Sequence, residues 1–327
     1  MKKSIFNLLL LLGISISVNA QVINIPDAKF KNAVLAKYAY ADKNQNGQID
    51  KFEAETFTSL DVSYALIDNL EGIEAFTNLT ELKCNSNQLT ALNVSKNTKL
   101  KDLECFSNRL TALDLHLNTA LVTLDCSNNQ LKTIELSNNV NLLELYCSRN
   151  LLSQLDLSHN NKLIELGCLR NNISSLNINE LTFLEHLFCN NNQLQSLDIS
   201  KNVFLKTLFC DSNQIASLDL SKNIDLRDVY CHANKLKILN TAKNVALVNL
   251  SCSSNQLTNL NLNNNLLLKE LFCSYNQLSA LNLSSLSKIS YLTSFQNPLL
   301  NQICIAPNTN TSNWIKDPKT VFISNCK

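Results

Sequence analysis

The sequence predicts a solenoid, a fold in which short coils of chain stack on one another through parallel β-strands. Ten cysteines recur every 21 residues without an insertion, each within a pattern close to Leu-x-x-Leu-x-Cys-x-x-Asn. The apolar residue that opens the pattern and the asparagine that closes it keep the same period over eleven coils. A fixed period of this length is typical of repeat proteins in which each coil contacts its neighbours. The cysteines are Cys84, Cys105, Cys126, Cys147, Cys168, Cys189, Cys210, Cys231, Cys252 and Cys273.

Each repeat contains the pattern twice. In the first full repeat, residues 79–87 are followed by residues 89–97, with the same spacing of apolar positions and a closing asparagine. The alternation of apolar residues in both halves predicts a short strand on each side of a flat coil, and therefore two parallel ladders with little helix. No proline occurs between Pro26 and Pro298, which suits long uninterrupted ladders.

Residues 1–20 have the pattern of a cleaved secretory signal peptide. Lys2 and Lys3 precede the apolar run 5–18, and Ala20 supplies a small residue at the cleavage point. We therefore expect a mature chain from Gln21 that is secreted or held at the cell surface, with the periplasm as the other destination. The apolar run is too short to span a membrane as a helix, and no long apolar segment follows it, so we expect no membrane span.

The charge of the chain excludes some partners. Of the 28 basic side chains, 26 remain once Lys2 and Lys3 are removed, against 27 acidic ones. A near-neutral chain without a basic stripe gives no electrostatic reason to expect nucleic acid or an anionic membrane as a partner. Binding must come from local surface chemistry.

Residues 21–57 are expected to form a helical segment that carries a calcium-binding loop. Apolar residues at helical spacing predict a helix over 27–40. The twelve residues that follow, from Asp42 to Glu53, match every position of the EF-hand loop, with Gly47 at the sharp turn. The expected ligands are side-chain oxygens and, at Gln48, the backbone carbonyl. They are Asp42, Asn44, Asn46, Gln48, Asp50 and Glu53.

The predicted calcium site has three carboxylates, because Asn44 and Asn46 hold positions at which other loops carry aspartate. We therefore expect an affinity in the extracellular range, roughly 10⁻⁴–10⁻³ M, and a structural role for Ca²⁺. The alternative is a polar turn between the helix and the solenoid that binds no metal.

The two ends of the repeat region are expected to be caps. Residues 58–78 keep inward apolar spacing but diverge from the 21-residue pattern, and residues 298–327 leave the period altogether and contain the single tryptophan, Trp314. Cys304 and Cys326 lie outside the ladder, and in an exported protein they are the best candidates for a disulfide, worth about 3 kcal/mol. Terminal repeats need such covers because an open edge invites aggregation.

The ladder cysteines are predicted to be buried free thiols. Strands in a ladder are about 4.8 Å apart, which exceeds the Cβ separation of roughly 3.8 Å that a disulfide prefers. The alternatives are a metal site or a thiol-redox function. These need clustered sulfurs or Cys-x-x-Cys spacing, and the sequence has neither.

The double repeat over residues 79–297, with cysteine in place of the sixth-position leucine, resembles the 21-residue bacterial class of leucine-rich-repeat proteins. The order of segments, Ile25 to Phe30, then the calcium-type loop, then Gly72 to Asn78, is similar to that of secreted bacterial leucine-rich-repeat proteins. The resemblance implies a leucine-rich-repeat solenoid with a helical N-terminal cap and an irregular C-terminal cap. It also implies surface-exposed protein recognition.

The binding site is expected on the outward positions of the main sheet. The column between the fourth-position leucine and the cysteine carries five aromatic residues, where solvent would favour polar groups. Such patches mark binding sites, and aromatic residues are typical binding hot spots. The alternative is that the rings stack on one another and stabilise the ladder. The residues are Tyr146, Phe188, Phe209, Tyr230 and Phe272.

We expect a non-enzymatic binding protein whose partner is another protein. The four histidines lie on different coils, and no serine or cysteine sits in a nucleophile motif. A glycan-binding module is the first alternative, because stacked aromatic rings also suit sugar rings. A structural envelope protein without a specific ligand is the second.

Overall fold

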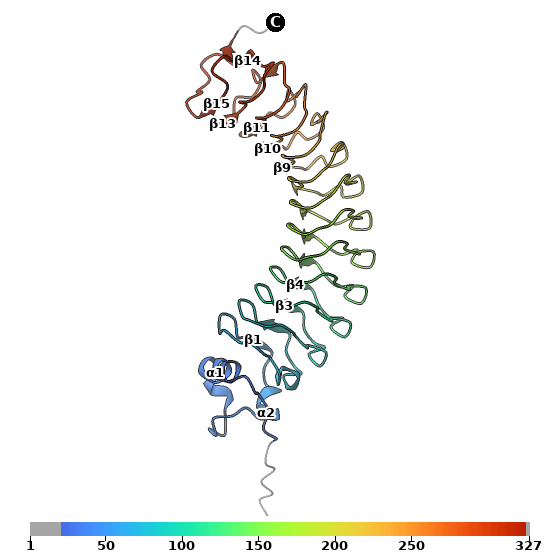
Figure 1. The fold of residues 1–327 in the computed structure, drawn as a ribbon, viewed down its shortest axis with the longest axis vertical. Coiled ribbons are helices and arrows are strands. Elements are labelled where there is room, and N and C mark those ends of the chain that lie inside the picture. The colour runs from blue at the N-terminus through green and yellow to red at the C-terminus, as the bar shows by residue number, and fades with distance from the viewer. Residues whose placement is uncertain (1–20, 325–327) are drawn as a thin grey trace, which may run out of the picture.

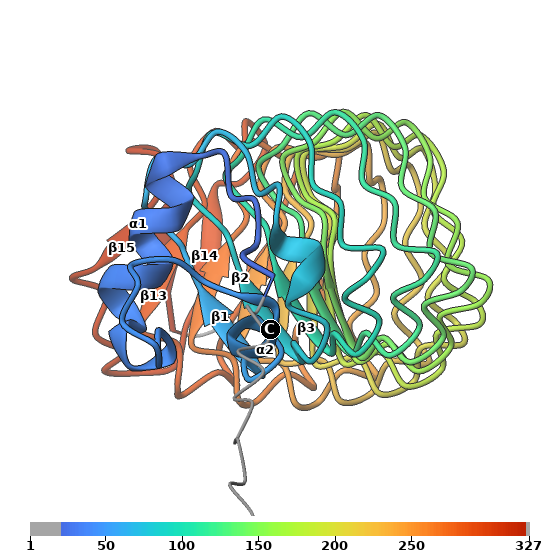
Figure 2. The same cartoon turned by 90° about the horizontal axis from the view of Figure 1, so that it is seen from below.

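The computed structural model describes residues 21–324. Its main element is a sheet of 13 parallel strands that curves into an arc, with the strands on the inner, concave side (Figure 1). The view from below shows the coils stacked one behind another (Figure 2), and their inward apolar side chains form one continuous core. The strands of the sheet are β1 (Ser59–Asp61), β2 (Glu81–Lys83), β3 (Asp102–Glu104), β4 (Thr123–Asp125), β5 (Glu144–Tyr146), β6 (Glu165–Gly167), β7 (His186–Phe188), β8 (Thr207–Phe209), β9 (Asp228–Tyr230), β10 (Asn249–Ser251), β11 (Glu270–Phe272), β13 (Tyr291–Thr293) and β15 (Trp314–Ile315).

The predicted leucine-rich-repeat solenoid is confirmed, including the register of its coils. Adjacent strands pair residues 21 positions apart, as Leu187 pairs with Leu208. The middle residue of each strand is buried, while the first and third point out of the coil. The terminal coils are longer by one residue, since Leu60 pairs with Leu82 and Leu292 pairs with Trp314.

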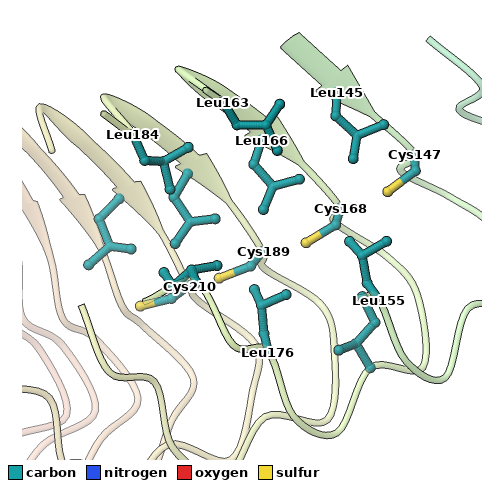
Figure 3. Packing of buried hydrophobic residues seen from close by; sticks show 14 of the residues in the cluster. Leu145, Cys147, Leu155, Leu163, Leu166, Cys168, Leu176, Leu184, Cys189 and Cys210 are labelled. Carbon is teal, nitrogen blue, oxygen red and sulfur yellow. The ribbon is translucent and has the colours of Figure 1, made fainter. Parts of the chain in front are cut away.

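The cysteine ladder lies just behind the strands. All ten ladder cysteines are free thiols, and each is fully buried. Their sulfurs follow one another from coil to coil between the leucine columns, as Cys168, Cys189 and Cys210 show in Figure 3. The predicted role of the thiols as small buried apolar groups is therefore confirmed.

The asparagine that closes each pattern joins two coils. The side-chain nitrogen of Asn150 donates to the carbonyl of Cys126 in the preceding coil at 3.0 Å and to the carbonyl of Cys147 in its own coil at 3.1 Å. Its side-chain oxygen accepts from the amide of Leu131 at 2.9 Å. Because donor and acceptor are both used, the amide can be buried without an unsatisfied polar atom.

The prediction of a second continuous ladder is wrong. On that side the described residues form strands only at the C-terminal end, in a small sheet of β12 (Leu281–Asn282), β14 (Gln302–Cys304) and β16 (Val321–Ile323). Elsewhere a polar side chain turns the backbone, as where Asp198 accepts from the amide of Ser200 at 2.9 Å. A side chain that bonds its own backbone two residues on favours a turn over a strand.

A second asparagine column replaces the missing ladder. The side-chain nitrogen of Asn202 donates to the carbonyls of Ile178 and Leu181 in the preceding coil, at 3.0 and 2.8 Å. Its side-chain oxygen is buried without a partner, as are the equivalent oxygens of six further asparagines. In these seven asparagines the side-chain nitrogen is therefore hydrogen-bonded and the side-chain oxygen is not. The six are Asn97, Asn118, Asn139, Asn160, Asn223 and Asn244.

The N-terminal cap packs on the first coil. Helix α1 (Ala28–Lys37) is capped by Asp27, whose carboxylate accepts from two amides of the first turn. The helix ends at Lys37 and is therefore shorter than the predicted 27–40. It is followed by η1 (Ala39–Ala41), α2 (Lys51–Ala54) and η2 (Ile73–Ala75). Gly72 has φ +102°, and a Cβ there would lie 2.8 Å from the carbonyl of Asn24. The close approach of chain 21–25 to the divergent coil therefore requires a glycine.

The C-terminal cap is more regular than the sequence predicts. Strand β15 continues the main sheet, and β14 and β16 form the small one. Trp314 is buried against the last coil, with Phe322 edge-on to it at 5.7 Å between ring centroids. No helix among residues 21–324 is long and apolar enough to cross a bilayer. The expected signal peptide, residues 1–20, lies outside the described residues.

Candidate functional site

The concave face of the sheet holds the five aromatic residues that the sequence singled out. Phe188, Phe209 and Tyr230 stand on consecutive strands, β7 to β9. Their ring centroids are 5.2 Å apart for the first pair and 4.4 Å apart for the second. Phe272 on β11 packs instead with Tyr291 on β13 at 5.4 Å. The concave face thus holds two stacks, separated at Ser251 on β10.

Tyr146 stands apart from both stacks. Its strand neighbour is Gly167, whose position in the sheet is covered by the Tyr146 ring. A Cβ at residue 167 would lie 3.0 Å from a ring carbon of Tyr146. Because Gly167 has no side chain, the Tyr146 ring can pack over it on the sheet. The column of aromatic residues is therefore interrupted between Tyr146 and Phe188. Two of the five predicted residues, Tyr146 and Phe272, are not in contact with the central three through their rings.

All five side chains are half-buried. The stacking between neighbouring strands accounts for part of that burial and contributes to the stability of the ladder. The expected patch therefore consists of ring faces and edges that both pack on one another and line the concave surface. Tyr291 belongs to it and escaped the sequence analysis, because it occupies the first rather than the third position of its strand.

The concave face is acidic at its N-terminal end. Strands β2 to β6 carry six carboxylates on their outward positions, against the single cation Lys83, which bonds Glu104 at 2.8 Å and Glu81 at 3.2 Å. Burial raises the pKa of Asp102 and of Asp125. The carboxylates are Glu81, Asp102, Glu104, Asp125, Glu144 and Glu165.

A polar cluster lies at the end of the central strands. The Nε2 of His232 is 3.4 Å from the Asp211 carboxylate, and its Nδ1 is 3.1 Å from the Ser251 hydroxyl. Burial raises the pKa of the Asp211 carboxyl, and the nearby His232 lowers it by a smaller amount. Ser251 is 6% exposed, so its hydroxyl is closed off from a substrate. The three side chains link adjacent coils, and this arrangement suits a structural role rather than nucleophilic catalysis.

The predicted calcium loop turns sharply at Gly47, which adopts φ +71°. The Asp42 carboxylate accepts from the amides of Asn46 and Gly47 at 3.0 and 2.8 Å, which fixes that turn. The exit of the loop is held by the N-terminal segment, because the amide of Ile23 donates to the carbonyl of Ile49 at 2.9 Å.

The carboxylates of the loop do not converge on one point. Glu53 accepts from the backbone amides of Lys43 at 2.8 Å and Asp50 at 3.0 Å, and closes a capping box with Asp50 at the start of α2. No group of three or more His, Cys, Asp or Glu side chains within residues 21–324 is arranged to hold a metal ion. The donors suit Ca²⁺ in kind, since all are oxygens, but Glu53 would have to exchange its amide bonds for the ion.

The predicted disulfide joins a described residue to one that is not. Cys304 lies in β14 and is 7% exposed. Cys326 lies outside the described residues, so the pairing stays a prediction.

A second surface escaped the sequence analysis. It lies on the loops that enter strands β5 to β11, and its apolar side chains are more exposed than the concave aromatic residues. We call it the entry flank. A hollow of about 440 Å³ lies in it, lined by Leu143, Lys162, Ile164, Phe183, Glu185 and Phe204. The signal in the sequence is a run of apolar residues at the positions around the opening leucine. Its exposed members are Val140, Ile164, Phe183, Val203, Phe204, Ile224, Val245, Leu266 and Leu267.

Neither the family models nor the curated proteins match this chain. Solved structures do match it. The functional domain of InlJ from Listeria monocytogenes, described as including a cysteine ladder, superimposes with a TM-score of 0.81. It is 33% identical, over 92% of this chain and 70% of that one.

Two further structures share the fold. Internalin InlF from Listeria monocytogenes has a TM-score of 0.67 and 21% identity, over 92% of this chain and 96% of that one. The leucine-rich-repeat ectodomain of the receptor kinase GASSHO1/SCHENGEN3 from Arabidopsis thaliana, solved with CASPARIAN STRIP INTEGRITY FACTOR 2, has a TM-score of 0.66 and 22% identity. That match covers 84% of this chain and 40% of that one. On its identity with InlJ and on their common cysteine ladder, the chain belongs to the internalin-type leucine-rich-repeat proteins.

Proposed function

We propose that the chain is a non-enzymatic recognition protein that binds a protein partner on its concave face. The observation that carries this proposal is the stack of Phe188, Phe209 and Tyr230 at the centre of that face, beside the acidic strands. Aromatic residues give a large contact area for little lost conformational freedom, which is why they dominate binding hot spots. The plant ectodomain solved with its bound factor shows that a solenoid of this fold can bind a separate molecule.

The charge of the face indicates the chemistry of the partner. Outward carboxylates outnumber cations on strands β2 to β6. A partner with basic groups opposite these strands and apolar groups opposite the aromatic stack would match both halves. Residues 1–20 support export of the chain, which would bring the face to partners outside the cytoplasm.

Substitution of the stack is expected to abolish partner capture. A variant with Phe188→Ser, Phe209→Ser and Tyr230→Ser removes the apolar surface while keeping the strand backbone. The mature parent and the variant, both checked by circular dichroism, are used to capture proteins from surface extracts. We expect specific partners with the parent, captured more weakly as salt rises, and none with the variant.

The matched control changes aromatic residues outside the central stack. A Phe272→Ser and Tyr291→Ser variant should keep most of the binding if the central stack is the hot spot. Equal capture by the parent and the triple variant would show that the stack serves ladder packing alone. Capture that survives protease digestion of the extract would indicate a glycan instead.

We further propose that the loop Asp42 to Glu53 binds Ca²⁺ as a structural ion. The sharp turn at Gly47 and the backbone partner of Ile49 support this, because both shape the loop through contacts within the chain. The ion would bring Glu53 to the side chains of Asp42 and Asn46, and so tie α2 to the loop.

Calcium is expected to raise the thermal stability of the parent protein. At a concentration ten times the dissociation constant, binding stabilises the folded state by about 1.4 kcal/mol. The melting temperature is measured in EDTA, in Ca²⁺ and in Mg²⁺, for the parent and for an Asp42→Ala variant, and binding is followed by calorimetry. A parent without binding heat, melting alike in all three solutions, would leave the loop as a polar turn.

A further inference from the structure

The entry flank carries two exposed rings between two charges near its centre, and it lies apart from the proposed recognition face. Phe183 and Phe204 lie on consecutive coils and are 58% and 50% exposed. They occupy the position just before the opening leucine of their repeats. The coil before carries Lys162 at that position, and the coil after carries Asp225. The order along the flank is therefore cation, ring, ring, anion.

This order is self-complementary when the flank is reversed. Reversal about the point midway between the two rings places Phe183 on Phe204 and Lys162 on Asp225. At the position just after the opening leucine, Glu185 falls on Lys206, but these two already form an ion pair within the chain, and Ile164 falls on Arg227. The complementarity therefore belongs to the position before the leucine, where opposite charges meet and rings meet rings.

The shape of the solenoid permits such a pairing. The coils are evenly spaced, since each strand pairs with the next at a fixed offset of 21 residues through this region. A twofold axis that runs across the arc from its outer to its inner side reverses the order of the coils and keeps the direction of curvature. Two arcs of the kind in Figure 1 would then lie flank to flank along their length.

The charged groups at the ends have room for a second partner. Lys162 donates to the neutral side-chain oxygen of Asn141 at 2.7 Å, so its positive charge has no carboxylate partner among the described residues. Asp225 is exposed and forms no ion pair within residues 21–324. We propose that the entry flank is the interface of an antiparallel homodimer, with Lys162 of each copy facing Asp225 of the other around a core of Phe183 and Phe204.

This arrangement has the composition of a stable interface, with an apolar centre and a charged rim. It leaves both concave faces free and turned the same way. The proposal does not depend on what the concave face binds.

Charge exchange across the flank tests the proposal. The molecular mass of the mature protein is measured by analytical ultracentrifugation over a range of concentrations. We expect a dimer for the parent and a monomer for Phe204→Glu, which buries a charge at the centre. Lys162→Asp alone and Asp225→Lys alone should each weaken the dimer about tenfold, because each creates two repulsive contacts.

The double variant, with Lys162→Asp and Asp225→Lys, should recover the affinity of the parent, since the exchange restores both pairs. A parent that remains monomeric, or a double variant no tighter than the two single ones, would overturn the proposal. All four variants change exposed side chains, and circular dichroism confirms that each is folded. The concave-face variant Phe188→Ser, Phe209→Ser and Tyr230→Ser should dimerise like the parent.

Discussion

Raising the pH from about 8 to about 10.5 is expected to unfold the protein. The ladder thiols are fully buried, and burial raises their pKa, to about 12 for Cys84, Cys168 and Cys273. In the unfolded chain the same thiols ionise near pH 8.5–9. Above that pH the folded state holds more protons than the unfolded state, so the free energy of unfolding falls as the pH rises.

The size of this effect follows from the number of thiols. Each contributes about 1.4 kcal/mol per pH unit once the pH exceeds its pKa in the unfolded chain, so ten contribute about 14 kcal/mol per unit. Domains are typically stable by about 5–15 kcal/mol in total. The stability that these buried thiols give is therefore fully present below about pH 8 and falls progressively as the pH rises towards their raised pKa of about 12. The loss exceeds the total stability of a typical domain within roughly two pH units.

Urea unfolding over a pH series, in the presence of a reductant, measures this dependence. A variant with Cys189→Val and Cys210→Val serves as the control, because it keeps the apolar volume of two coils but lacks two titrating groups. Its slope should be lower by about 2.8 kcal/mol per pH unit. A free energy of unfolding that stays level from pH 8 to 10.5 would contradict the buried, protonated ladder.

Replacing Asn150 by leucine is expected to destabilise the solenoid more than replacing Asn160. Asn150→Leu orphans the buried amide of Leu131. The carbonyls of Cys126 and Cys147 each lose one donor but keep another, from Asn129 and Asn171. A buried polar group left unsatisfied costs about 1–3 kcal/mol, so we expect a loss in that range.

Asn160→Leu provides the matched comparison on the opposite side of the coil. It removes one donor from each of the carbonyls of Leu136 and Asn139, but both keep a backbone donor, from the amides of Asn139 and Leu142. It also removes a side-chain oxygen that is already buried without a partner. No group is newly orphaned, so the loss should be smaller, below about 1 kcal/mol. Urea midpoints of the parent and both variants give the ranking, and an equal loss for the two would contradict it.

The sequence was sufficient for the period, the buried cysteines and the first asparagine column, because each depends on a pattern that repeats without interruption. It was misleading for the second ladder. The same alternation of apolar residues occurs there, but side chains such as Asp198 bond the backbone two residues on and bend it out of a strand. Apolar alternation predicts which side chains turn inward, and local hydrogen bonds decide whether the backbone pairs.

The candidate site was predictable in its residues but not in its arrangement. The aromatic column could be read from the repeat, and the gap at Gly167 was visible in it. That Tyr146 lies over this gap depends on ring packing that no spacing encodes. The entry flank was missed because it lies on loops, where the exposure of a residue depends on the path of the backbone.

The asparagine amides also determine how the solenoid would yield to a pulling force. Each one links its coil to the coil before it, as Asn150 does, so the links act in series along the axis. Release of one regular coil would free 21 residues, or about 70 Å of extended chain, while the remaining coils keep their links. A chain anchored at one end and bound at its concave face would therefore lengthen in discrete steps under load. Each step would limit the force that reaches the bound partner.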